Sequence, residues 1–208
     1  MSKVFITIKT AFTKLSAYHK AYSSNYLWPL ILPFRQLQLK QIAKKVAALS
    51  NCGLMLDIGT GYGYLPGEVA KRCPDVQIVG IDLGVELIND GIKSIRDKRL
   101  TNRISFLRAK AEFLPFADNI FDMVVSTMSL HLWHDRQCGI NEVRRVLKPG
   151  GRCLVLVGRS YLLHGLEHIT DYFTQRSISQ VSTLLDSAGF KEFKVVKIDD
   201  TLEIIATK

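Results

Sequence analysis

The chain has 208 residues, of which 47% are hydrophobic and 23% charged, so its length and composition fit one globular domain and exclude a disordered chain. No apolar run reaches the roughly 18 residues of a membrane-spanning helix, and the first residues are not expected to be a secretory signal. The formal net charge is +9, and the four cysteines form no CxxC pair, which argues against a zinc knuckle and fits a reducing, cytoplasmic compartment.

The first quarter of the chain carries nearly all of the net charge. Residues 1–56 contain eight basic residues and no acidic residue, whereas the remainder is close to neutral. This asymmetry predicts attraction to an anionic membrane, a nucleic acid or an acidic substrate, or else a solvated basic face.

Residues 1–34 show no regular pattern, and Pro29 and Pro33 are expected to break regular structure there. Apolar residues at helical spacing predict a helix over 36–49. We therefore divide the chain into a basic, partly helical N-terminal cap and a core domain, with the boundaries 1–45 and 46–208. The cap also holds an apolar cluster suited to a membrane interface or a greasy substrate: Tyr22, Tyr26, Trp28, Leu30, Ile31 and Phe34.

Beyond residue 53, strand and helix patterns alternate along the chain. The strands are apolar throughout, and glycines, prolines or acidic residues bound most of them, which is typical of a parallel sheet covered by helices on both faces. The expected strands are 54–58, 76–83, 104–107, 121–126 and 153–157, and the expected helices are 65–73, 85–97 and 135–147.

The end of the sequence has a different pattern. A helix is predicted over 178–188, where Gly189 follows as a C-terminal cap. Two apolar runs then follow, 193–198 and 202–207, with only three residues between them. A parallel partner would need a crossover of a dozen or more residues, so these two strands must be antiparallel.

The segment Leu56-Asp57-Ile58-Gly59-Thr60-Gly61-Tyr62-Gly63 is the most informative in the sequence. A strand ends near an acid, and three glycines then let a ligand approach the backbone before a helix begins. The dinucleotide fingerprint does not fit, because its third glycine would fall on Tyr64 or Pro66. A phosphate-binding P-loop does not fit either, because the chain has no Gly-Lys-Ser/Thr.

This spacing resembles motif I of the class I S-adenosylmethionine-dependent methyltransferases. Four downstream segments strengthen the resemblance, which covers residues 54 to about 158. The stretch from Ser126 to Trp133 is similar to one in the small-molecule branch, which includes the ubiquinone and menaquinone methyltransferases (type 11). The other three are Asp82 at the end of the second strand, Ala111–Asp118 with Phe121-Asp122, and Arg145–Gly151.

The resemblance implies a Rossmann-like, doubly wound α/β sheet of seven strands in the order 3-2-1-4-5-7-6, with strand 7 antiparallel. It implies S-adenosylmethionine as cofactor and S-adenosylhomocysteine as product. Asp82 would accept the ribose hydroxyls, although it also suits the start of the following helix. The chain departs from the pattern at Lys110, which replaces an adenine-binding acid, and at Leu132, which replaces a histidine. The cofactor-binding residues implied are Asp57, Gly59, Thr60, Gly61, Gly63, Asp82, Leu83, Ala111, Glu112 and Ser126.

The implied chemistry is a direct displacement at an activated methyl group, in which the protein aligns the nucleophile and excludes water. His131 is the candidate catalytic base, because it follows the fourth strand at the edge where ligands bind, and its alternative is a structural or packing role. No cluster of ligating residues predicts a metal site. The sequence has neither an Asn/Asp-Pro-Pro-Tyr motif after the fourth strand nor a Pro-Cys nucleophile, which weighs against DNA methylation.

Three functions remain open at this point. The first is methylation of a small, hydrophobic or lipid-like acceptor by a cytoplasmic protein that touches an anionic membrane peripherally. The second is methylation of RNA or protein, with residues 1–56 binding the partner, so nucleic acid stays among the candidate partners. The third is a non-catalytic module that only binds the cofactor. The oligomeric state is not predicted.

Overall fold

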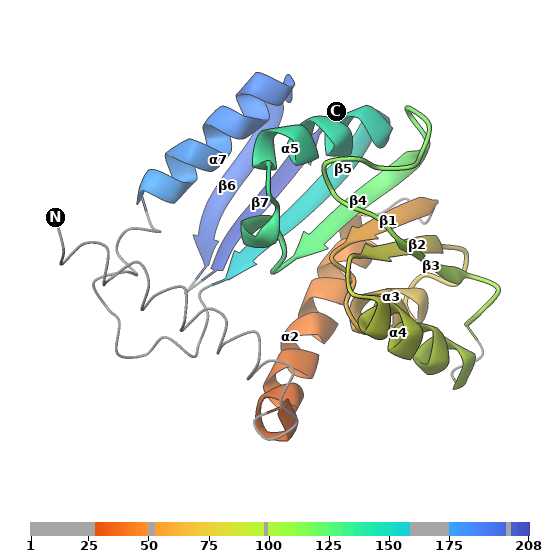
Figure 1. Ribbon diagram of the computed structural model, residues 1–208. Helices are drawn as coiled ribbons and strands as arrows, with labels where there is room; N and C mark the ends of the chain where they lie inside the picture. Colours follow the sequence, from red (N-terminus) through yellow and green to blue (C-terminus); the bar gives the residue numbers. More distant parts are fainter. Residues whose placement is uncertain (1–27, 50–52, 98–99, 159–174, 199–200) are drawn as a thin grey trace, which may run out of the picture. The chain divides into compact units, whose positions relative to one another are not determined.

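A seven-stranded sheet forms the centre of the computed structural model, which describes residues 28–49, 53–97, 100–158, 175–198 and 201–208 (Figure 1). The strand order is β3-β2-β1-β4-β5-β7-β6, as predicted. Strands β1 to β5 pair in parallel, and β7 runs antiparallel to both of its neighbours. The strands are β1 (Leu54–Ile58), β2 (Gln77–Asp82), β3 (Ile104–Arg108), β4 (Phe121–Thr127), β5 (Leu147–Gly158), β6 (Glu192–Ile198) and β7 (Thr201–Thr207).

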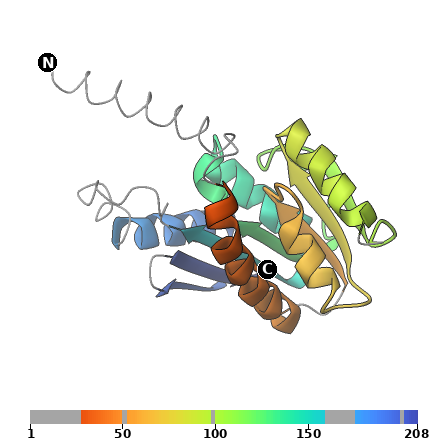
Figure 2. The same cartoon turned by 90° about the horizontal axis from the view of Figure 1, so that it is seen from below.

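Two pairs of helices cover different parts of this sheet. Helices α5 (Arg136–Val146) and α7 (Gln175–Ala188) lie next to one another over the half that contains β5 and β6. Helices α3 (Tyr64–Ala70) and α4 (Val85–Asp97) group near β2 and β3 (Figures 1 and 2). One apolar core joins α5, α7 and the sheet, and each large side chain buried in it contributes about 1.5–3 kcal/mol.

The helix that precedes the sheet is longer than predicted. The structure has α2 (Trp28–Leu49), so the expectation that Pro29 and Pro33 break regular structure is wrong. Pro29 lies in the first turn, where an N–H has no intrahelical partner, and Pro33 removes only one backbone bond from the helix. No helix in the described ranges is long and apolar enough to cross a bilayer.

The last turns of α2 contact the sheet at β7. The compact unit that carries the sheet begins at Ile42, and Lys45 forms an ion pair with the buried Glu203 of β7. The neighbouring Ile204 belongs to the core shared with α5 and α7. Because side chains alternate along a strand, this end of α2 and the pair α5–α7 lie on opposite faces of the sheet.

Strand β5 also begins earlier than the predicted 153–157. It starts at Leu147 and includes the turn-like residues Pro149 and Gly150, and its register with β4 shifts between Phe121 and Met123. Lys148 Nζ binds both carboxylate oxygens of Asp122 at 2.8 and 2.9 Å. A turn signal in the sequence is therefore accommodated here as an irregularity within a strand.

The predicted antiparallel pairing of the last two strands is confirmed. Strands β6 and β7 pair from Glu192 with Thr207 to Ile198 with Thr201. The two residues between them, 199 and 200, lie outside the described residues, as do the first 27 residues of the predicted cap. The side chains of the cap's apolar cluster are likewise not described.

Candidate functional site

The predicted site residues lie at the carboxyl edge of the sheet, where the strand order reverses. From β1 the chain goes to β2 and β3 on one side, and then returns to β4 on the other side of β1. Ligands of doubly wound sheets bind in the crevice at such a switch point. The glycine loop 59–63 follows β1 at this place.

The three glycines of the loop are required for different reasons. All have left-handed backbone angles, with φ of 76° at Gly59, 55° at Gly61 and 68° at Gly63. A Cβ on Gly59 would lie 2.4 Å from the Cβ of Ser129, and one on Gly63 would lie 2.5 Å from the ring of Phe106. A Cβ on Gly61 would meet no atom within 4 Å. Gly59 and Gly63 therefore permit close packing, whereas Gly61 faces open space.

Asp82 joins the glycine loop to the turn that follows β2. Its Oδ2 accepts the Gly61 N–H at 2.9 Å, and its Oδ1 accepts the Gly84 N–H at 2.9 Å. Gly84 precedes α4, so the bond to it is compatible with the alternative role of Asp82 at the start of that helix. Each carboxylate oxygen retains a lone pair for a further donor.

Asp57 is the most unusual carboxyl group of this edge. Its side chain is 1% exposed, and its Oδ1 has no hydrogen-bond partner among the described residues. Burial raises the pKa of Asp57 to about 7, and the charge of Asp82 adds to this rise. The Thr60 hydroxyl lies near enough to oppose the rise, although its Oγ1 also lacks a partner of hydrogen-bond geometry in the described chain. A buried carboxyl group whose oxygen lacks a hydrogen-bond partner in the described residues favours a cationic ligand.

A chain of buried hydroxyl groups supports the loop from β4. Ser126 is fully buried, and its Oγ lies 2.6 Å from the Oγ of Ser129, which donates to the Ile58 carbonyl at 3.0 Å. The Trp133 indole N–H donates to Ser129 Oγ at 3.3 Å. Met128, between the two serines, has a φ of 58°, a strained value of the kind that clusters at ligand sites. Ser129 and Trp133 were not predicted as site residues.

Glu112 ties the loop after β3 to the segment before α5. Its Oε1 accepts the backbone N–H of His134 at 2.6 Å and of Asp135 at 3.2 Å. Although partial burial opposes it, these bonds lower the pKa of Glu112. The adjacent Ala111 is buried, whereas Phe113 is 80% exposed. The carboxylate of Glu112 thus holds the loop in place.

Helix α5 clamps the same loop a second time. Glu142 Oε2 accepts the Leu114 N–H at 2.7 Å, and Arg145 donates to the carbonyls of Leu114 and Phe116 at 2.9 and 2.8 Å. Arg145 Nε also donates to Glu142 Oε1 at 2.6 Å. Arg145 lies in one of the segments that resemble the family, but no role was predicted for it. No local spacing connects it with partners about 30 residues away.

His131 is an exposed residue of a turn of 3₁₀ helix, Leu130–Leu132, which follows β4. Desolvation by the surrounding protein lowers the pKa of His131, and the positive charge of Arg136 lowers it further. Its imidazole is therefore neutral near pH 7 and able to accept a proton. Leu83 and Leu132 at this edge are largely exposed and apolar. In the described part of the chain, no group of three acidic, histidine or cysteine side chains is arranged to hold a metal ion.

Comparison with known proteins gives consistent matches. A family described as a methyltransferase domain, Methyltransf_11, matches residues 56–155. A ubiquinone/menaquinone biosynthesis C-methyltransferase of Geobacter sp. (strain M21) is 36% identical over 118 residues, which are 56% of this chain and 50% of that protein. A demethylmenaquinone methyltransferase of Porphyromonas gingivalis is 28% identical over 150 residues, covering 72% and 59% of the two chains. The chain thus spans about half the length of the curated relatives it matches.

Solved structures show the same fold. One from Methanococcus maripaludis has a TM-score of 0.74 at 23% identity, covering 94% of this chain and 93% of the other. The phosphoethanolamine N-methyltransferase 2 of Haemonchus contortus, solved with S-adenosyl-L-methionine, has a TM-score of 0.68 at 19% identity, covering 82% and 52%. At these identities the likeness concerns the fold.

Proposed function

Because the chain belongs to the class I S-adenosylmethionine-dependent methyltransferases, in their type 11 branch, we propose that it transfers a methyl group from S-adenosylmethionine to a small hydrophobic acceptor. Two features at the switch point of the sheet carry this proposal: a buried Asp57 oxygen that has no hydrogen-bond partner among the described residues, and open space above Gly61. When bound, the cofactor supplies a methyl group already activated by a sulfonium.

The residues at this edge fit such a cofactor. Asp57 would hold the positively charged amino group of the cofactor. Burial disfavours the ionised form of Asp57, and a nearby positive charge would stabilise that form. Asp82 would accept the ribose hydroxyls with the lone pairs left by Gly61 and Gly84. We assign the adenine to Leu83 and to the backbone of Ala111 and Glu112. The remaining predicted residues shape the loop and its support: Gly59, Thr60, Gly63 and Ser126.

Asp82→Ala is expected to weaken the binding of S-adenosylhomocysteine by about 1–3 kcal/mol, because two backbone N–H groups and the ribose lose their acceptor. Calorimetry with the purified chain measures this loss. Asp75→Asn, which changes an exposed carboxyl elsewhere, is the control and should bind as wild type does. Unchanged affinity in Asp82→Ala would show that the ribose lies elsewhere.

For the acceptor we propose a reduced quinone ring, methylated on carbon, in line with the names of the relatives. A ring carbon beside a hydroxyl group becomes nucleophilic when that hydroxyl loses its proton. His131, kept neutral near pH 7, takes this proton. After the methyl group has been added, the ring carbon releases its own proton to solvent, and the protonated His131 returns its proton to the ring oxygen. The exposed Phe113 and Leu132 offer an apolar surface to such a ring.

The function is tested by incubating the chain with methyl-labelled S-adenosylmethionine and a short-chain demethylmenaquinol. We expect a labelled C-methyl product, identified by mass spectrometry. His131→Gln should lower kcat about 10²-fold or more while the affinity for S-adenosylhomocysteine stays unchanged. Cofactor binding without transfer to any quinol would contradict the acceptor. Absence of cofactor binding would contradict the whole proposal.

We further propose that residues 1–45 act as a cap over the acceptor and contact an anionic membrane peripherally. The support is their charge, with eight basic residues and no acidic one, and their apolar cluster. Each basic side chain near an anionic surface contributes about 1 kcal/mol. Such a contact would let the protein reach a hydrophobic quinol dissolved in the bilayer. The described ranges contain no helix that could cross the bilayer.

A further inference from the structure

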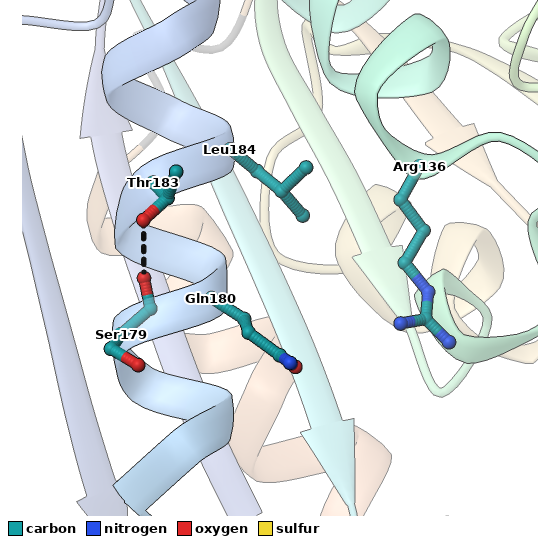
Figure 3. Close-up of a pocket in the computed structure, with 5 residues that line it drawn as sticks. All are labelled: Arg136, Ser179, Gln180, Thr183 and Leu184. Atoms are coloured by element: carbon teal, nitrogen blue, oxygen red, sulfur yellow. Dashed lines mark hydrogen bonds between the residues drawn. The ribbon is translucent and has the colours of Figure 1, made fainter.

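A pocket lies between α5 and α7, apart from the glycine loop. Its lining residues are Arg136 at the start of α5 and a face of α7 made by Ser179, Gln180, Thr183 and Leu184. Figure 3 shows the side chains of Gln180 and Leu184 extending from α7 into the space between the two helices, with Arg136 on the other side of this space. None of the five residues is acidic, so the lining offers one positive charge, neutral polar groups and one apolar side chain.

The guanidinium of Arg136 has no ion pair or hydrogen bond within the described residues. The acids that could pair with it are engaged elsewhere. Asp135 Oδ1 accepts the Cys138 N–H at 2.9 Å as the cap of α5, and Glu142 is held by Arg145 and the Leu114 N–H. The five N–H donors of Arg136 therefore remain available to an external acceptor.

The wall of the pocket is fixed in position. Gln137 Nε2 donates to the Leu184 carbonyl at 3.2 Å and thereby joins α5 to α7. Thr183 Oγ1 donates to the Ser179 carbonyl at 2.9 Å, which is drawn in Figure 3. Leu184 packs against the core beside the fully buried Leu185. A ligand would thus meet a rigid α7 face opposite a long, adaptable arginine.

One lining residue of the pocket, Arg136, lies close to His131 of the candidate site. Arg136 lies near enough to His131 for its charge to act on the imidazole, and both residues follow β4 at the carboxyl edge of the sheet. An acceptor held at Arg136 would be close to the proposed base.

We propose that this pocket is a subsite for an oxyanion on a flat apolar ring, a carboxylate or a phenolate, bound by Arg136 and Gln180 with the ring against Leu184. The guanidinium fork matches the two oxygens of a carboxylate and also stabilises a single phenolate oxygen. That this oxyanion belongs to the methyl acceptor rests on the proposed function, because the acceptor ring would then carry an anionic group.

The test measures the binding of three probes to the chain saturated with S-adenosylhomocysteine, by NMR titration. The probes are benzoate, its neutral isostere benzamide, and 4-nitrophenolate. Benzoate is expected to bind wild type at least five times more tightly than benzamide, and Arg136→Gln should remove this difference. Arg136→Lys should keep part of it. Arg96→Gln, which removes an exposed arginine at the end of α4, is the matched control and should bind benzoate as wild type does.

The outcomes separate the two proposals. Benzoate affinity that is equal in wild type and Arg136→Gln, or no benzoate binding to wild type, overturns the subsite. Tighter binding of 4-nitrophenolate than of benzoate assigns the pocket to a phenolate, and the reverse assigns it to a carboxylate. Binding of S-adenosylhomocysteine is measured on the same samples. If S-adenosylhomocysteine does not bind, the proposed function is overturned. In that case, benzoate binding to wild type and to the Arg136 variants, measured without S-adenosylhomocysteine, still decides whether the pocket binds oxyanions.

Discussion

Gly61→Val is expected to remove measurable binding of S-adenosylhomocysteine, a loss of about a hundredfold or more. The valine would fill the open space above the loop, where a Cβ meets no protein atom within 4 Å and where we place the ligand. It would also be strained at a φ of 55°, by about 1–2 kcal/mol. Calorimetry and thermal unfolding of the same samples separate the lost ligand space from the strain.

The chain offers a matched control for this experiment in Gly150. This glycine, in the turn-like part of β5, has a φ of 75°, and a Cβ on it would also meet nothing within 4 Å. Gly150→Val should therefore lose a similar amount of stability and keep its affinity for S-adenosylhomocysteine. If both variants lost affinity equally, strain in the fold would explain the effect and the site would be misplaced.

Asp57→Asn is expected to stabilise the ligand-free protein at high pH. The pKa of Asp57 is about 7 in the folded protein, against an ordinary 3.8, so between these values the folded state keeps a proton that the unfolded state has lost. Stability therefore falls as the pH rises through this window, and asparagine, which does not ionise, escapes this loss. The advantage of the variant should grow by about 3 kcal/mol between about pH 5 and about pH 8.5.

Urea unfolding at the two pH values measures this change. Asp75→Asn, which changes an exposed carboxyl elsewhere, is the control variant. Parallel stability curves for wild type and Asp57→Asn would contradict the raised pKa. The same asparagine should weaken the binding of the cationic cofactor, because the ionised Asp57 is the group that the positive charge favours.

Much of the fold follows from the sequence because apolar strands and short connections restrict the topology. The short predicted gap between the last two strands forces an antiparallel pair, and the glycines after β1 mark the edge of the sheet that holds the candidate site. The prediction failed where local signals compete with longer-range structure. Proline residues remained inside α2, and a Lys-Pro-Gly-Gly turn became part of β5, held by Lys148 and Asp122.

The candidate site divides in the same way. Gly61 is recognisable because its left-handed backbone requires glycine, and Asp57 and Asp82 because they stand near the ends of two strands in segments that resemble those of the family. The residues that support them are not recognisable from the sequence. Side chains such as those of Ser129 and Arg145 bond to backbone atoms far along the chain, and such contacts produce no periodic pattern in the sequence. The pocket at Arg136 was also unforeseen, since it depends on α7 lying next to α5.

Trp133 provides the protein with an internal fluorophore at this site. Its indole N–H bonds to Ser129, whose hydroxyl bonds to the end of β1, and the ring itself is buried. Trp28 is the only other tryptophan in the sequence, so a Trp28→Phe protein emits from Trp133 alone. The wavelength and lifetime of that emission then report whether the segment carrying His131 stays attached to β1, in real time and without any added label.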